Sequence, residues 1–333
     1  MPVAPVPTEQ GPRLLLGAPI AAEIRATVRQ DIATFVERRG YTPTLAIVLV
    51  GRDAPSAVYL RQILRACEAA GIGGRLVEIE GGSAGGDPET RVVEAIQRLN
   101  EDPLVAGIIV QMPLPPTVRL RAVIDAIDPA KDIDGIHPLN AGLLRLGYDG
   151  FLPATAHAAI EILVQSGIAI AGREAVVIGR SNVVGMPVAF LLVRHHATVT
   201  VCHTKTRDLA AQVGRAEILV VAAGHPGLVT GAMLRPGAVV VDVGINVVGD
   251  SIVGDVEFES ARDVVSAITP VPGGVGPLTN ALLLTHLVRA ASAQAEAHAA
   301  VSGADADADS RAAADADSRA DAAADADAPA DGR

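Results

Sequence analysis

The sequence predicts a two-domain α/β fold in which helices alternate with buried, mainly parallel strands. Short apolar runs alternate with helical patterns along the chain, one of these runs enters a glycine turn that opens a helix, and 333 residues exceed the usual size of a single domain. We expect an N-terminal α/β domain at 13–152, to which residues 274–302 return as a helix. A Rossmann-like nucleotide-binding domain is expected at 153–273.

The first domain is expected to hold three buried strands separated by helices. The apolar runs are short and rich in Val, Ile and Leu, which is typical of parallel strands covered on both faces. The helical pattern at 56–70 carries an apolar stripe that includes Ile63. The expected strands lie at 45–50, 75–79 and 105–110, and the expected helices at 19–39, 56–70, 90–100 and 120–127.

The stretch AVVIGRSNVVGMP at 175–187 combines a strand, a tight turn and a helix start. Gly179 ends the apolar run, and Ser181 or Asn182 can cap the helix that follows. The N-terminus of that helix offers N–H groups and the positive end of its dipole to a phosphate. The spacing lacks the middle glycine of the usual dinucleotide fingerprint, and Gly185 is its last glycine. Taken alone, the pattern is equally compatible with an ordinary strand–helix turn that binds no ligand.

The next expected strand, at 197–201, indicates which nucleotide this turn would bind. NAD sites place an acid near the end of this strand, whereas here Thr204 and Lys205 follow it and no acid occurs before Asp208. Arg180 lies in the glycine turn itself. Cationic and hydroxyl groups suit a ribose 2′-phosphate, so the sequence favours NADP over NAD. Solvated loop charges are the alternative interpretation of Arg180 and Lys205.

The rest of the second domain follows the same alternation. A helix at 155–166 leads into it, and a hairpin is expected at 247–253. After a glycine-rich loop, Thr279 can cap a long helix from 280 to about 297. The further buried strands are expected at 218–222 and 239–243.

Composition excludes several classes of protein. The net charge is −11, but −6 of it belongs to residues 303–333, an Ala/Asp tract that we expect to be disordered. No basic surface for nucleic acid, no membrane span, no signal-peptide layout and no metal-ligand spacing is evident. Cys67 and Cys202 lie in unrelated motifs, so a reduced, cytoplasmic protein without metal is expected.

Six stretches in this chain carry a more specific signal when they are taken together. They are LAIVLVGRDAPSAVY, GIIVQMPLP, KDIDGIHPLN, VVIGRSNVVGMP, TVTVCHTKT and ITPVPGGVGPLT. In their order and their motifs they resemble the methylenetetrahydrofolate dehydrogenase/cyclohydrolase family, over nearly all of the chain from about residue 20 to residue 290. The resemblance implies hydride transfer from methylenetetrahydrofolate to NADP in one-carbon metabolism. In many members of the family, hydrolysis of the methenyl product to formyltetrahydrofolate follows.

The resemblance also assigns roles to individual residues and makes the first domain the catalytic, folate-binding one. Tyr59 would stack against the folate, Gln111 would reach the reacting centre, and Asp134 would bind the amide edge of the pterin. Lys131 and Asp132 are expected to brace the loop rather than react. The implied substrate loop is Pro272, Gly273 and Gly274, and the implied cofactor-binding residues are Gly179, Arg180, Ser181, Gly185, Thr204, Lys205 and Ile245.

Three departures from the family pattern concern the folate half. The family's Tyr-x-x-x-Lys is here Tyr59 to Ile63, so an isoleucine stands where the family lysine assists proton transfer. Residues 153–158 read PATAHA in place of Pro-Cys-Thr-Pro-x-Gly, and residues 16–18 read LGA in place of Asp-Gly-Lys. We therefore expect dehydrogenase activity and regard cyclohydrolase activity as doubtful.

The resemblance further implies a homodimer joined through the nucleotide-binding domains, with tetrahydrofolate derivatives as substrates and no nucleic-acid or membrane partner. Two alternatives stay open. One is a dehydrogenase of a different pterin or small substrate, and the other is a folate- or NADP-binding pseudoenzyme. Gln111 and Asp134 argue against the pseudoenzyme, because a pure binder has little use for groups at a reacting centre.

Overall fold

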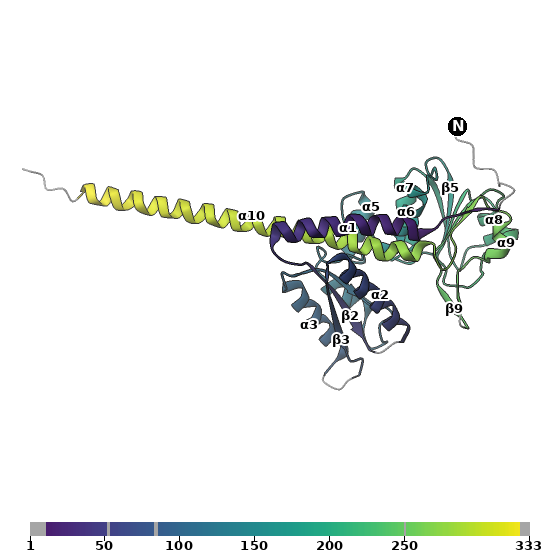
Figure 1. The fold of residues 1–333 in the computed structure, drawn as a ribbon, viewed down its shortest axis with the longest axis horizontal. Helices are drawn as coiled ribbons and strands as arrows, with labels where there is room; N and C mark the ends of the chain where they lie inside the picture. The colour runs from purple at the N-terminus through teal and green to yellow at the C-terminus, as the bar shows by residue number, and fades with distance from the viewer. Residues whose placement is uncertain (1–10, 52–53, 83–85, 250, 327–333) are drawn as a thin grey trace, which may run out of the picture. The chain divides into compact units, whose positions relative to one another are not determined.

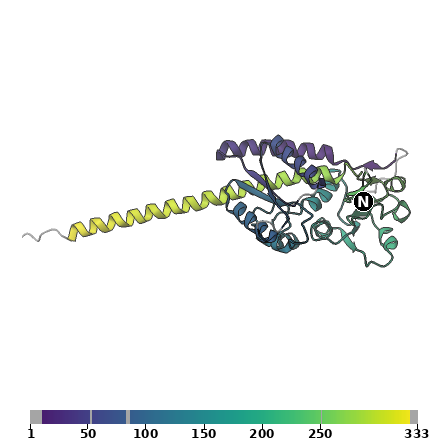
Figure 2. The same ribbon diagram turned by 90° about the horizontal axis from the view of Figure 1, so that it is seen from below.

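The computed structural model describes residues 11–51, 54–82, 86–249 and 251–326, apart from the side chains at 54–59 and from 301 onward. Its contacts divide the chain into two units, Met1–Ala290 and Ala291–Arg333. The first unit contains a three-stranded sheet and a six-stranded sheet, which occupy separate regions in both views (Figures 1 and 2). The expected α/β architecture with parallel sheets is confirmed.

The N-terminal region forms the three-stranded parallel sheet, with strand order β3-β2-β4. Its central strand is buried along almost its whole length, as the Val/Ile/Leu run predicted. The helices that follow its strands cover both faces, and Figure 1 shows α2 and α3 on opposite sides of β2 and β3. The elements of this region are α1 (Gly17–Arg39), β2 (Thr44–Val50), α2 (Ala54–Ala70), β3 (Gly73–Ile79), α3 (Pro88–Glu101), β4 (Val105–Val110), α4 (Leu120–Ala126) and α5 (Pro138–Leu146).

Alternation along β2 explains why both faces are apolar. Ala46, Val48 and Val50 belong to a core cluster that includes Val92 and Ile96 of α3. On α2, Ile63 is only 2% exposed, so it is a core residue as its place in the apolar stripe suggested. The strands β2 and β4 are therefore buried on both faces, and their carboxyl ends are where ligands can reach them.

The second region forms the six-stranded sheet, with strand order β1-β11-β8-β7-β5-β6 and every pairing parallel. The chain passes from β5 to β6 on one side and then crosses to β7 on the other side of β5. This reversal is the topological switch point of a doubly wound sheet. The elements are β1 (Arg13–Leu14), α6 (Ala154–Gln165), β5 (Glu174–Ile178), α7 (Gly185–Arg194), β6 (Thr198–Cys202), α8 (Leu209–Val213), β7 (Ile218–Val221), η1 (Gly231–Met233), β8 (Val239–Asp242), β9 (Asn246–Val248), β10 (Ser251–Val253), α9 (Phe258–Arg262) and β11 (Ala267–Ile268).

The predicted strands and helices are confirmed to within a few residues, and the predicted hairpin is the antiparallel pair β9–β10. Two pairings were not predicted, that of β1 with β11 and that of β11 with β8. The first places Arg13 and Leu14 on the six-stranded sheet. Runs of two residues are too short for a periodic pattern, so neither β1 nor β11 could be expected from the sequence.

The last helix, α10 (Val275–Ala326), differs from the expectation at both ends. It begins before Thr279, whose hydroxyl donates back to the Val275 carbonyl (3.4 Å) instead of capping the helix. It continues through the Ala/Asp tract to Ala326, where a disordered segment was expected. The reason is that alanine has the highest helix propensity and needs no buried partner to adopt a helix. Among the described residues, no helix is both long and apolar enough to cross a bilayer.

We expect a protein truncated after Ser302 to keep its melting temperature and its activity. Alanine and aspartate side chains offer little apolar area to bury, so the free energy of unfolding should change by less than about 0.5 kcal/mol. Differential scanning calorimetry of the full and truncated chains tests this. A clear fall in Tm or in kcat would show that the tract docks on the protein.

Candidate active site

Two glycines shape the turn between β5 and α7. Gly179 has φ +125°, and a Cβ there would lie 2.2 Å from the carbonyl oxygen of Ala222, which follows β7. At Gly185 a Cβ would lie 2.2 Å from the carbonyl oxygen of Gly179. Only glycine permits these approaches, so the turn lies tightly against the switch point between β5 and β7.

Ser181 occupies the position of the missing middle glycine and organises the start of α7. Its Oγ accepts from the N–H groups of Val184 (3.1 Å) and Gly185 (3.3 Å), although the N-cap position of α7 is Val184 rather than the expected Ser181 or Asn182. The turn that precedes these N–H groups lies at the carboxyl edge of β5. This arrangement is that of a helix N-terminus facing a phosphate, although a serine replaces one glycine.

The predicted cationic groups follow two neighbouring strand ends. Ile178, at the end of β5, is paired in register with Cys202, at the end of β6. Arg180 follows the first strand and Lys205 the second, and both side chains are exposed, as is that of Thr204. The structure therefore brings these three residues to one sheet edge. Ile245, just before β9, is 68% exposed beyond the end of β8.

Two buried carboxylates that the sequence analysis did not single out hold the neighbouring loops of this edge. Asp255 accepts from three consecutive backbone N–H groups that follow β7, those of residues 223–225, at 2.6–2.9 Å. Asp242 at the end of β8 accepts from the N–H groups of Gly244, Asp255 and Val256 at 2.8–3.0 Å. A signal was present in the sequence, since Asp242 ends an apolar strand, but its partners are distant along the chain.

Gln111 lies at the corresponding point of the smaller sheet. The chain visits β3 on one side of β2 and β4 on the other, so the carboxyl ends of β2 and β4 form a second switch point. Gln111 directly follows β4, and its N–H donates to the carbonyl of Val48 (2.9 Å). Its side-chain Nε2 donates to the Met112 carbonyl (2.7 Å), and the side chain is half-buried. The amide therefore lies where a ligand of this sheet would bind.

Asp134 is placed beside this edge by a short parallel pairing. A β-bridge joins Asp132 to Ile108 of β4, and the chain turns directly after it, with the N–H of Gly135 donating to the Asp132 carbonyl (3.1 Å). Asp134 therefore lies in a turn beside β4, the strand that Gln111 follows. Burial, together with the charge of Asp132, raises the pKa of Asp134 to about 7, and the N–H of Ala154 at the start of α6 opposes that rise only in part. Such a carboxylate has remaining capacity for N–H donors.

Asp132 and Lys131 brace this loop, as predicted. Asp132 is fully buried and accepts from the N–H groups of Ile136 (3.1 Å) and His137 (2.8 Å) and from Nδ2 of Asn140 (2.8 Å). Nζ of Lys131 donates to three main-chain carbonyls at the end of α3, those of Leu99, Asn100 and Asp102, at 2.6–3.1 Å. The lysine caps a helix, and burial lowers its pKa.

Of the other predicted folate residues, the loop of Pro272 to Gly274 is described in full and Tyr59 only in its main chain. The side chain of Tyr59 lies outside the described residues, although its helix α2 is described. The loop of Pro272 to Gly274 lies between β11 and α10, so it comes from the other sheet. Gly273 has φ +112° and its carbonyl accepts from the N–H of Gly17 (2.9 Å) at the start of α1. A Cβ on Gly17 would lie 1.9 Å from the Gly274 carbonyl oxygen, so glycine is needed there.

Comparisons with known proteins agree with this arrangement. The model of the tetrahydrofolate dehydrogenase/cyclohydrolase catalytic domain matches residues 15–134, and that of the NAD(P)-binding domain matches residues 153–295. The chain is 47% identical over 293 residues to bifunctional protein FolD of Bordetella petrii, covering 88% of this chain and 98% of the relative. It is 48% identical over 280 residues to that of Moorella thermoacetica, covering 84% and 98%.

Solved structures give the same result. The bifunctional FolD methylenetetrahydrofolate dehydrogenase/cyclohydrolase of Campylobacter jejuni matches with a TM-score of 0.81 and 39% identity, over 84% of this chain and 99% of that one. The dehydrogenase-cyclohydrolase of Trypanosoma brucei, solved with NADP cofactor and an inhibitor, matches with a TM-score of 0.81 and 36% identity, over 86% and 99%.

Proposed function

Because the chain belongs to the tetrahydrofolate dehydrogenase/cyclohydrolase family, we propose that it is an NADP-dependent methylenetetrahydrofolate dehydrogenase of one-carbon metabolism. The observation that carries the proposal is that Gln111 follows β4 at its carboxyl end while Asp134 lies in the turn beside the same strand. The switch point of the nucleotide-binding sheet provides the second half of the site. Hydrolysis of the methenyl product is treated separately, because Ile63 stands at the family lysine position.

In this proposal the folate is held by a carboxylate and an amide from one sheet. Asp134 accepts the N–H groups of the pterin's amide edge, which its single main-chain partner leaves room for. Gln111 contacts the reacting carbon region, and Tyr59 stacks on the folate. The loop of Pro272 to Gly274 closes the site from the other sheet. Positioning of this kind lowers the barrier of a hydride transfer without any proton carrier.

The residues of the second sheet fit NADP. The tight glycine turn of Gly179 and Gly185 opens α7 toward a phosphate, with Ser181 ordering its first turn. Arg180, Thr204 and Lys205 provide the polar surroundings of the 2′-phosphate, and Ile245 contacts the cofactor. When bound, NADP⁺ supplies the hydride acceptor.

Replacing Arg180 by Ala should lower kcat/KM for NADP⁺ and leave that for NAD⁺ nearly unchanged. A charge-assisted contact is worth about 1.5–3 kcal/mol, which corresponds to roughly a 10- to 150-fold loss. Steady-state kinetics with both cofactors provide the measurement. Arg194→Ala, at the exposed C-terminal end of the helix α7 that follows the Arg180 turn, is the matched control. Equal losses for both cofactors would rule out a contact with the 2′-phosphate.

We further propose the domain division 13–152 plus 274–302 for folate binding and catalysis and 153–273 for NADP. A homodimer through the nucleotide-binding domains is supported by apolar side chains around the β9–β10 hairpin. Val247, Val248 and Ile252 are 73%, 52% and 47% exposed there. A reducing cytoplasm is supported by Cys67 and Cys202, which are both buried and free. Light scattering of the purified protein measures the oligomeric state.

A substrate panel tests the proposal against its rivals. NADP⁺ reduction should depend on methylenetetrahydrofolate and be slow with a truncated methylene-bridged pterin that keeps N10 and the aminobenzoyl ring but lacks the glutamate. Faster reduction with the truncated pterin would favour a different pterin as substrate. Binding of folate and NADP without reduction would favour the pseudoenzyme.

A further inference from the structure

Two histidines outside the predicted site lie against each other in the interior, next to the Asp134 loop. His157 is on α6 and His286 on α10, and their rings are nearly parallel, with 7° between the planes and 5.4 Å between the centroids. His286 is only 4% exposed. Nδ1 of His157 lies 3.2 Å from Nε2 of His286, and Nδ1 of His286 lies 2.8 Å from the carbonyl oxygen of Ile133. The two rings therefore form a hydrogen-bonded chain that ends on the main chain.

The acceptor at the end of this chain fixes the position of every proton in it. A carbonyl oxygen only accepts, so Nδ1 of His286 carries a hydrogen and donates it to Ile133. Burial, together with the neighbouring His157 and Arg289, lowers the pKa of His286 to about 4, which leaves its ring neutral and its Nε2 free of hydrogen near neutral pH. Nδ1 of His157 must then be the donor to Nε2 of His286. The Ile133 carbonyl thus selects the tautomer of His286, and His286 selects that of His157.

The carbonyl that His286 holds belongs to the peptide plane that joins Ile133 to Asp134. Fixing that plane fixes the direction in which the Asp134 side chain leaves the main chain. The carboxylate also receives the N–H of Ala154, three residues before His157 on the same helix. Gly135, the next residue, packs closely against the main chain that precedes α6, because a Cβ on Gly135 would lie 2.4 Å from the Leu152 carbonyl carbon. The loop is therefore anchored on both sides of Asp134.

The ring of His286 is itself held by the network that braces Asp132. Phe151 lies 5.9 Å from His286 between ring centroids, and its own N–H donates to Oδ1 of Asn140 (3.2 Å). Asn140 in turn donates to Asp132 (2.8 Å). The guanidinium of Arg289 lies 4.5 Å from the centroid of the Phe151 ring. Residues 132, 133 and 134 are thus each fixed by a different partner, and His286 supplies the anchor of residue 133.

We propose that His286, oriented by His157, is a positioning residue that sets the direction of the Asp134 carboxylate for binding the pterin. The inference rests on the proposed folate role of Asp134. Neither histidine contacts the folate in this account, and both act only through the Ile133–Asp134 peptide. Their loss therefore affects folate affinity and leaves NADP binding and the chemical step largely unchanged.

Three variants separate positioning from mere support of the fold. His286→Leu replaces the ring with an apolar side chain of similar size and so removes the donor to the Ile133 carbonyl. His286→Asn restores an N–H close to the place of Nδ1. For His286→Leu, loss of one hydrogen bond should raise KM for methylenetetrahydrofolate about 3- to 10-fold, with kcat and the KM for NADP⁺ changing less than about twofold. His286→Asn should return the folate KM to within about twofold of the original value.

Each other outcome has a defined meaning. An unchanged folate KM in His286→Leu, or an equal rise in both KM values that Asn does not reverse, overturns the positioning role. If His286→Leu does not fold, His157→Phe takes its place, because its side chain is 25% exposed; it should raise the folate KM about 2- to 3-fold, and an unchanged KM overturns the proposal. If the unmodified protein has no dehydrogenase activity, the proposed function fails instead. Amide hydrogen exchange over 131–137 then decides the positioning role, which requires faster exchange in His286→Leu than in His286→Asn.

Discussion

Methenyltetrahydrofolate formed by this protein should accumulate and decay no faster than it does in buffer. Opening the methenyl ring requires water to lose a proton and a ring nitrogen to gain one, which is general acid–base work worth about 10²–10⁴-fold. Ile63 stands where the family lysine assists that transfer. Its side chain is 2% exposed in the core and has no group that exchanges protons. Oxidation of methylenetetrahydrofolate needs no such group, so dehydrogenase activity should survive.

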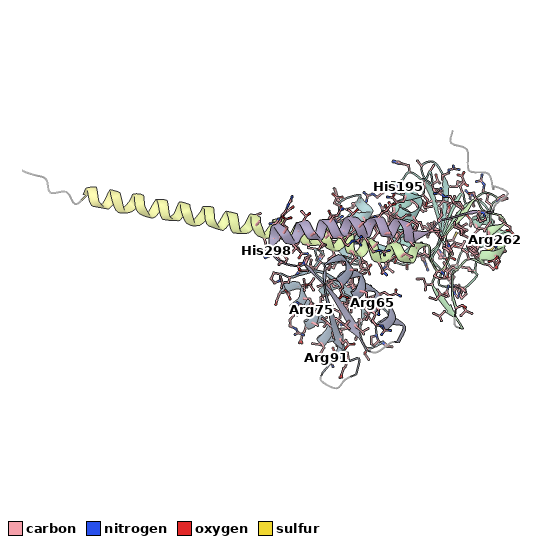
Figure 3. All side chains as sticks on the ribbon, viewed as in Figure 1. Arg65, Arg75, Arg91, His195, Arg262 and His298 are labelled. Carbon is pink, nitrogen blue, oxygen red and sulfur yellow. The ribbon has the colours of Figure 1, made fainter. Side chains whose placement is uncertain are left out.

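The neighbouring residues do not replace the lysine. Arg61, Gln62 and Arg65 are exposed on α2 (Figure 3 labels Arg65), and neither arginine nor glutamine side chains release and accept protons near neutral pH. Nζ of Lys131 is already directed at three carbonyls at the end of α3. Among the described residues, a water held by Gln111 and the Asp134 carboxyl, whose pKa is about 7, are the alternatives.

The variant Ile63→Lys tests the assignment directly. Its stem must lie along the apolar stripe of α2 for its amine to reach the folate site, so the substitution should lower Tm while it raises the rate of methenyl hydrolysis at least about tenfold. Ile63→Met, which is similar in size and carries no base, is the control and should not raise that rate. Absorbance of methenyltetrahydrofolate measures the hydrolysis. Rapid hydrolysis by the unmodified protein would contradict the prediction and point to Gln111 or Asp134.

Folate turnover should depend steeply on the ionisation of Asp134. With a pKa of about 7, the carboxyl is largely protonated below that pH and cannot accept both pterin N–H groups. We therefore expect kcat/KM for methylenetetrahydrofolate to rise about tenfold per pH unit up to pH ~7 and to level off above it. Asp134→Asn should remove this step and lower kcat/KM about 10- to 150-fold above pH 7.

The same substitution should stabilise the ligand-free protein at high pH. The pKa of Asp134 in the folded state lies above that of an unfolded aspartate, about 3.9, so the stability contributed by its protonated form is lost as pH rises through about 7. Asp134→Asn should therefore raise Tm above pH 7 and change it little near pH 4. The exposed Asp149→Asn is the control for both profiles. A pH profile of kcat/KM that is flat from 5 to 8 would show that another group binds the pterin.

The strong local patterns of the sequence were sufficient to predict the sheets and the place of Gln111, which directly follows an apolar strand at its carboxyl end. The position of Asp134 beside β4 follows from the bridge between Ile108 and Asp132, which no local pattern indicates. The glycine turn was predicted because Gly179 directly follows the apolar run of β5. In contrast, the capping of α3 by Lys131 depends on carbonyls about 30 residues away along the chain, which no local pattern indicates.

Contacts between residues that are far apart in the sequence account for most of what could not be predicted. His286 donates to a carbonyl 153 residues away, and its neighbour His157 is 129 residues away. Each histidine alone is an ordinary helix residue. The helix through the Ala/Asp tract was not expected for a different reason: composition indicates that the tract has no core to bury, whereas the many alanines favour helical backbone.

A single progress curve tests the central claim most directly. The purified protein is mixed with methylenetetrahydrofolate and NADP⁺, and NADPH and methenyltetrahydrofolate are followed together by absorbance. The account predicts that the two products rise in equal amounts, that the methenyl signal persists after NADPH formation stops, and that NAD⁺ supports a slower rate. Absence of reduction with either cofactor would contradict the proposed dehydrogenase.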